Sequence, residues 1–331
     1  MSEIGTVSPS EDGVETLDED LRDMLVQAVR RGAKITDSHL STLDKGFSVN
    51  GTNTLVHCYA PALDANGRLK PKALAQFLFD RIIDYAIPRK AVEIAQEQML
   101  KTGSTAEWMK LQRKAKAAFT DLDKSGEGGE FLLFALAEAV FELTQILCKM
   151  SLKTSTSMHY HGADGVYASA TEDGYLNVYW GESKLYENPT NAITDCLKSL
   201  APFLREEFSD DATNAQDIYL VNEYANLTDP VTVAALKRFF DPDCEDANKL
   251  RLCGVALVGF DVDCFPEREQ AGIWEEIEAA LKEQLPKWQS HVSKRLGDEK
   301  LELFDIHFIC IPMRSVQEFR NEFMVLLKGV S

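Results

Sequence analysis

The sequence predicts an α/β protein in which a mixed β-sheet is flanked by helices, with a mainly helical region at its N-terminus. The first observation is the order of apolar patterns in the second half of the chain, which runs helix, strand, strand, helices, strand, helix, strand. The second is composition: 45% hydrophobic and 27% charged residues in 331 are typical of a globular protein with a buried core. The third is a pair of alternating strands joined by a short turn, which indicates a β-hairpin.

The first part of the chain is predicted to be an acidic leader followed by a mostly helical α/β region. Residues 1–16 are expected to be disordered, and residues 1–20 hold seven acids and no base. The region 17–120 contains one strand pattern, at 54–59. Helical spacing of apolar residues is predicted near 17–31, 71–84, 88–102 and 104–119.

A second domain is predicted over 121–331, because a glycine-rich stretch at 121–129 breaks the helical periodicity. Strands are predicted at 163–170, 175–183, 252–260 and 303–311. Helices are predicted at 130–148, 190–205, 213–223, 230–240 and 267–293, and from about 315 to the end.

The charge balance restricts how the chain could act on nucleic acid. Asp and Glu number 53 against 35 Lys and Arg, which gives a net charge of −18. Phosphate affinity comes mainly from Lys and Arg, so DNA binding must be local, assisted by a metal, or supplied by a partner. No apolar run is long enough for a membrane helix. The polar start and seven scattered cysteines without a C-x-x-C favour a reducing, cytoplasmic location.

The register of the predicted hairpin decides which side chains meet across its strands. A two-residue turn would set Asp164 opposite Ser183. A three-residue loop with Gly174 in the left-handed conformation instead sets Val166 opposite Trp180, and it collects the apolar residues on one face. We prefer the second register because it separates the apolar face from the polar face.

In the preferred register Asp164 lies opposite Glu182, with Lys184 on the diagonal. Charges on a core-facing surface are costly without partners, so we expect these side chains to meet. Two adjacent carboxylates suit Mg²⁺, with Mn²⁺ as a substitute, and such a cation polarises a scissile phosphate. Lys184 would then orient the attacking water and stabilise negative charge. The alternative is an ordinary hairpin whose terminal charges point to water.

Glu130 begins the predicted helix upstream of the hairpin and shares its apolar stripe. Two roles remain open for it: a third acid of the metal site, or a first-turn acid favoured by the helix dipole, worth under about 1 kcal/mol. If Glu130 is not the third acid of the metal site, Glu127 and Glu138 are the next candidates for that role. A second Asp-x-Lys, Asp298-Glu-Lys300, lies between a helix and a strand and has no facing acid.

The order of a helical Glu, a strand Asp and a Glu-x-Lys on the next strand resembles the PD-(D/E)xK nuclease superfamily. The local sequence over 128–187, with Gly-Glu-Phe-Leu-Leu, Gly-Ala-Asp-Gly-Val-Tyr and Tyr-Trp-Gly-Glu-Ser-Lys-Leu-Tyr, resembles the HamA family. HamA is the nuclease subunit of the bacterial Hachiman anti-phage system. Ala163 stands where the superfamily name has its proline.

The resemblance implies a restriction-endonuclease-like fold and a metal-dependent deoxyribonuclease. It makes Asp164 and Glu182 metal ligands, Lys184 the catalytic lysine and Glu130 a supporting acid of the metal site. It also implies a heterodimer with a HamB-type ATP-dependent helicase that delivers DNA and restrains cutting. The alternative hypothesis is that the protein is not an enzyme but a non-catalytic interaction subunit of a DNA-processing complex.

Other motifs are set aside. The segment from Asp121 begins like an EF-hand loop, but its twelfth position is Leu132 instead of Glu. The nearby glycines are not followed by the Lys-Ser/Thr of a P-loop. His159 and His161, just before the hairpin, are expected to be structural or to gate substrate.

Overall fold

A single sheet of seven strands organises the described part of the computed structural model and confirms the predicted α/β class. The structure describes residues 21–30, 35–36, 38–119, 126–152, 162–206, 212–268 and 270–329. The predicted leader 1–16 lies outside these residues. Antiparallel pairing at both edges encloses a parallel centre, in the order β1-β2-β7-β6-β5-β4-β3. The strands are β1 (Leu40–Ser48), β2 (Thr54–Pro61), β3 (Thr144–Leu147), β4 (Gly165–Ala170), β5 (Leu176–Tyr186), β6 (Leu250–Asp261) and β7 (Ile306–Met313).

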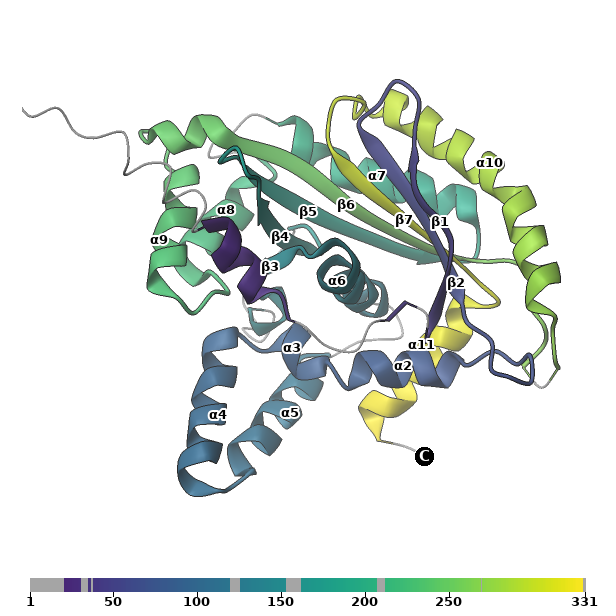
Figure 1. The fold of residues 1–331 in the computed structure, drawn as a ribbon, viewed down its shortest axis with the longest axis horizontal. Helices are drawn as coiled ribbons and strands as arrows, with labels where there is room; N and C mark the ends of the chain where they lie inside the picture. The colour runs from purple at the N-terminus through teal and green to yellow at the C-terminus, as the bar shows by residue number, and fades with distance from the viewer. Residues whose placement is uncertain are drawn as a thin grey trace, which may run out of the picture.

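Helices cover both faces of the sheet (Figure 1). One face packs against α7 and α10, with α8 and α9 at its end; the other packs against α6, α2, α3 and α11. A short helix at 21–28 precedes the sheet. The labelled helices are α2 (Pro71–Phe79), α3 (Ile82–Ala86), α4 (Arg89–Thr102), α5 (Ala106–Ala118), α6 (Glu127–Phe141), α7 (Pro189–Arg205), α8 (Ala215–Tyr224), α9 (Pro230–Phe239), α10 (Trp274–Asp298) and α11 (Val316–Lys328).

Local sequence explains the elements that carry the hairpin. β6 is a nearly continuous apolar run because both of its faces are covered by helices. α7 begins where the side chain of Asn188 accepts a hydrogen bond from the Asn191 amide at 3.1 Å, and Pro189 occupies its first turn. Its apolar stripe packs on β5 and β6. β5 is thereby held by β6 along one edge and by α7 on one face.

The hairpin of β4 and β5 has the predicted register. Val166 pairs with Trp180 and Ala168 with Val178. Gly174 has φ of 77°, the left-handed conformation expected for the end of a three-residue loop. The prediction is therefore confirmed, and with it the placement of residue 164 beside the end of β5.

Two predicted helices differ from the structure, and the strands β1 and β3 were not predicted. The helix predicted at 130–148 ends at Phe141, since Glu142 adopts φ of 54° and β3 follows. The helix predicted at 71–84 is divided into α2 and α3. The run to residue 148 looks like one helix because both the body of α6 and β3 are apolar and buried, so periodicity cannot mark where the helix ends.

The predicted domain boundary near residue 120 stays a prediction, because residues 120–125 lie outside the described part. β1 and β2 precede that boundary, yet β2 pairs with β7 and completes the same sheet. In the described residues, no helix combines the length and apolarity that crossing a bilayer requires.

Candidate functional site

Asp164 is tied to the end of β5 by three hydrogen bonds. Its amide donates to the carbonyl of Gly181 at 2.8 Å. Ser183 donates to Oδ2 of Asp164 twice, from its amide at 2.8 Å and from its hydroxyl at 2.7 Å. A Cβ at Gly129 would lie 3.1 Å from the Ser183 hydroxyl, so glycine at that position lets α6 approach β5 here. The Asp164 carboxylate is consequently fixed beside the Glu-x-Lys segment.

Glu182 and Lys184 form an ion pair on the same face of β5. The Glu182 side chain is 8% exposed. Burial raises its pKa to about 7, with the neighbouring Asp164 carboxylate adding to the effect. Burial also opposes the charge of Lys184, but the Glu182 carboxylate outweighs it and raises the lysine pKa. Lys184 is therefore protonated at neutral pH, next to two acids that repel each other.

A second buried ion pair holds the residue before Asp164. Lys149 lies 3.1 Å from Oδ1 of Asp217, and both side chains are buried. Lys149 also donates to the carbonyl of Ala163, whose amide donates to Oδ2 of Asp217 at 3.3 Å. Burial opposes both charges, lowering the pKa of Lys149 and raising that of Asp217. The Lys149–Asp217 pair therefore fixes the backbone of Ala163, the residue that directly precedes Asp164.

Sequence reasoning missed Lys149, Asp217 and Ser183. One signal was present for Lys149, which is the one charged residue between Glu142 and Lys153 in an otherwise apolar or neutral stretch. Nothing local marks Asp217, whose neighbours in α8 are unremarkable.

The structure places Glu130 beside Tyr85 of α3, whose hydroxyl donates to Glu130 Oε2 at 3.2 Å. The Tyr85 ring stacks on Phe131 with centroids 4.6 Å apart. Glu130 is thus held on the α6 side of the sheet, and its role as a supporting acid stays a prediction. Of the two next candidates for that role, Glu127 is buried in the first turn of α6, whereas Glu138 binds Arg89 at 3.1 Å.

The carboxylates are suited to a hard cation. In the described part of the chain, Asp164 uses Oδ2 for Ser183 and Glu182 uses Oε1 for Lys184, which leaves Oδ1 and Oε2 without hydrogen bonds. A divalent cation would relieve the repulsion that helps to raise the Glu182 pKa. Over the same described residues, no three His, Cys, Asp or Glu side chains converge as a ready metal cage. The set therefore fits Mg²⁺ held by one or two carboxylates and water.

Two other charged places lie apart from this cluster. Asp298 of the second Asp-x-Lys binds Arg295 at 2.9 Å.

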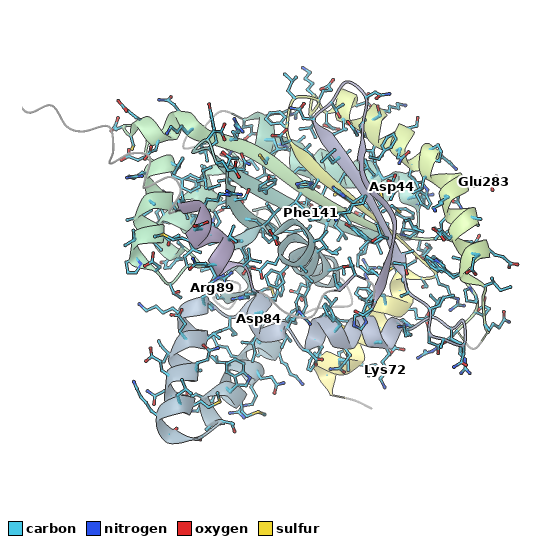
Figure 2. All side chains as sticks on the ribbon, viewed as in Figure 1. Asp44, Lys72, Asp84, Arg89, Phe141 and Glu283 are labelled. Carbon is cyan, nitrogen blue, oxygen red and sulfur yellow. The ribbon has the colours of Figure 1, made fainter. Side chains whose placement is uncertain are left out.

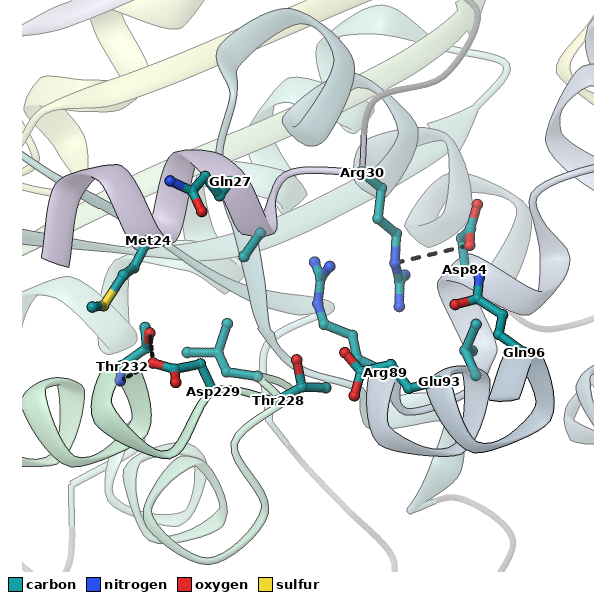
Figure 3. Close-up of a pocket in the computed structure, with 13 residues that line it drawn as sticks. Met24, Gln27, Arg30, Asp84, Arg89, Glu93, Gln96, Thr228, Asp229 and Thr232 are labelled. Atoms are coloured by element: carbon teal, nitrogen blue, oxygen red, sulfur yellow. Dashed lines mark hydrogen bonds and ion pairs between the residues drawn. The ribbon is translucent and has the colours of Figure 1, made fainter. Parts of the chain in front are cut away.

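A cavity of about 550 Å³ separates the helix at 21–28 from α4 and the start of α9 (Figure 3). Arg30 reaches toward Asp84 there, at 3.9 Å, and Arg89 also lines it. Both arginines have acid partners: Arg30 is paired with Asp84 of α3, and Arg89 of α4 is paired with Glu138 of α6.

Fold and site together define an α/β protein with an Asp-Glu-Lys cluster at the open end of a β-hairpin. The HamA family model matches residues 36–327 of the 331 residues, and the chain belongs to the HamA family, a component of Hachiman defence. The resemblance to HamA is thereby confirmed. A comparison with curated proteins finds no match.

Proposed function

We propose that the chain is a metal-dependent deoxyribonuclease that acts as the effector of an anti-phage defence system. The observation that carries the proposal is the meeting of Asp164, Glu182 and Lys184 at the end of the hairpin. Membership of the HamA family supports the defence role. The PD-(D/E)xK assignment is supported by the order of Glu130 on α6, Asp164 before β4 and the Glu-x-Lys on β5.

Asp164 and Glu182 would hold Mg²⁺ or Mn²⁺, with Glu130 as the candidate third acid. The cation would neutralise charge on the scissile phosphate and lower the pKa of water. Ser183 and the Lys149–Asp217 pair keep the Asp164 carboxylate in place. Lys184 stays protonated, and it would orient the attacking water and stabilise the oxygen on which negative charge develops. Burial of Glu182 strengthens each of these electrostatic interactions.

The proposal includes a partner, a HamB-type ATP-dependent helicase that forms a heterodimer with this chain in the cytoplasm. The support is charge: a net charge of −18 repels DNA, most strongly at low salt. A helicase that grips DNA would overcome this repulsion, and it would restrain the nuclease until aberrant DNA ends are met.

The test compares the lone chain with the co-expressed pair on circular and linear DNA, with Mg²⁺ and with chelator. We expect cleavage that needs the metal, and tighter DNA binding by the pair. A lone chain that binds duplex DNA as tightly as the pair, with no stable pair and no restraint of cutting, would contradict the partner proposal.

A second candidate function is a non-catalytic interaction subunit of a DNA-processing complex. It is favoured by the ion pair between Glu182 and Lys184, because the lysine compensates the charge of the buried Glu182 carboxylate without a metal. Absence of metal-dependent cleavage by both the lone chain and the pair would select this reading.

A further inference from the structure

The helical hairpin of α4 and α5 projects from the body of the protein (Figure 1). The two helices pack on each other and are joined through Gly103, which has φ of 70°. Each has few buried residues: Ala95 in α4, and Ala115 and Ala118 in α5. Most of this hairpin's surface is therefore available to a partner.

The hairpin is basic although the protein is acidic. Residues 89–118 contain seven Lys or Arg and three Asp or Glu, a balance of +4, which leaves −22 for the rest of the chain. A polyanion approaching the protein therefore meets a favourable potential at this hairpin and repulsion from the chain's average charge.

The basic side chains form one face of α5. Lys110, Arg113 and Lys114 are spaced i, i+3, i+4, which places them side by side on a helix, and all three are exposed. Lys110 binds Glu107 at 2.6 Å. Arg113 and Lys114 make no ion pair with any part of the chain that the structure describes. Their charges are thus available to an external anion.

Both ends of the hairpin are anchored at Tyr85, which hydrogen-bonds to Glu130 and interacts electrostatically with the Asp164 carboxylate of the candidate site. Tyr85, which donates to Glu130, lies four residues before the start of α4. Phe119, the residue that follows α5, packs on Tyr85 and Phe131, and its ring centroid lies 6.0 and 6.1 Å from theirs. Figure 2 labels Asp84 and Arg89 where the chain passes from α3 into α4. The basic face consequently extends from the same aromatic cluster that holds Glu130.

We infer that the exposed basic face of α5, formed by Lys110, Arg113 and Lys114, binds the phosphate backbone of the DNA that the neighbouring site cleaves. This inference rests on the proposed nuclease function. Binding through phosphates is independent of sequence and strongly dependent on salt. A contact of this kind supplies the local attraction that an acidic chain needs.

The experiment measures binding of full-length protein to a labelled duplex in chelator, where no cleavage can occur, over a series of salt concentrations. The variant is Arg113→Glu with Lys114→Glu. The matched control, Lys287→Glu with Lys294→Glu, makes the same charge change at exposed positions of α10. We expect the α5 variant to lose at least about tenfold in affinity at low salt, and its salt slope to fall by about 2. The control should stay within about twofold of wild type.

Circular dichroism of both variants first establishes that their helices are intact. If the α5 variant binds DNA as tightly as wild type or the control, the inference fails. If it keeps its DNA affinity but no longer co-purifies with the co-expressed helicase, the face docks a protein and the inference is overturned. Cleavage in Mg²⁺ is measured separately: loss of binding in a chain that never cuts would refute the nuclease and leave the DNA contact standing.

Discussion

Ser183 donates both its amide and its hydroxyl to one oxygen of Asp164, at 2.8 and 2.7 Å, and so joins the start of β4 to the end of β5. The residue between Glu182 and Lys184 therefore positions the acid of the neighbouring strand. The Glu-x-Lys segment acts as a unit in which each of its three side chains contacts another member of the cluster.

Replacing Asp164 or Glu182 with Ala should abolish binding of Mn²⁺ and cleavage, because each variant leaves only one carboxylate of the Asp164–Glu182 pair. The Glu182 variant should still fold, since the repulsion between Glu182 and Asp164 is relieved and offsets the loss of the ion pair with Lys184. Calorimetric titration of Mn²⁺ measures the effect. Asp298→Ala, in the second Asp-x-Lys, is the matched control and should bind like wild type. Unchanged titrations for both site variants would reject the metal assignment.

Lys184→Ala should separate metal binding from catalysis. Removing a cation beside the carboxylates should leave Mn²⁺ affinity equal or slightly higher, while the cleavage rate falls by about two orders of magnitude or more. Single-turnover cleavage at saturating metal is the measurement. A rate close to wild type would make Lys184 a structural residue.

Glu130→Gln should have a milder effect than the Asp164 and Glu182 variants. The amide keeps an oxygen that can accept from the Tyr85 hydroxyl, so the fold should be preserved. If Glu130 is the third acid, Mn²⁺ affinity and the cleavage rate both drop, though less than in Glu182→Ala. Identical values for wild type and variant would assign Glu130 to the helix dipole.

Lys149 and Asp217 should contribute to the free energy of unfolding as a pair and not independently. Lys149→Met leaves a buried carboxylate without its cation, so the free energy of unfolding should fall by about 3–5 kcal/mol. The double variant with Asp217→Leu should lose less than the sum of the single variants. Urea denaturation of the four proteins gives the coupling energy. Additive losses would show that the two side chains stabilise the fold independently.

His57 predicts a pH dependence of stability. Its Nε2 lies 3.2 Å from Nδ1 of His307, and burial followed by repulsion from His307 lowers its pKa from 6.5 to about 4. Between pH 6.5 and pH 4 the His57 imidazole is protonated in the unfolded chain but neutral in the folded protein. This contribution is therefore intact above pH 6.5 and is lost as the pH falls toward 4, on the order of 2 kcal/mol.

The measurement is the free energy of unfolding from pH 7 to 4.5, compared with His57→Phe. The variant should show a shallower loss over this interval, although it is less stable at pH 7 because His307 loses its hydrogen-bond partner. Parallel curves for the two proteins would exclude His57 as the source.

The hairpin was predictable because only one register sorts Val166 and Trp180 onto an apolar face. β1 was not, since Asp44, Lys45 and Gly46 interrupt its alternation and the strand is bulged on either side of Asp44–Lys45. Edge strands with such breaks carry little periodic signal.

The acids and the lysine of the site were predicted because a strand's period of two fixes their relative positions. The Lys149–Asp217 pair could not be, since the two residues belong to different elements and meet only when α8 packs beside β3. The two hydrogen bonds that Ser183 donates to Asp164 depend on the rotamer of the Asp164 side chain, which no sequence pattern specifies.

The pairing of β2 with β7 has a consequence for biosynthesis. His57 and His307 are neighbours in the sheet although 250 residues separate them. At about 5–20 residues per second, a ribosome needs roughly 12 to 50 seconds to make that stretch. Throughout this interval β2 has an open edge, exposed to pairing with other nascent chains. Mispairing of newly made β2 is thus a hazard that a chaperone on the translating ribosome would relieve.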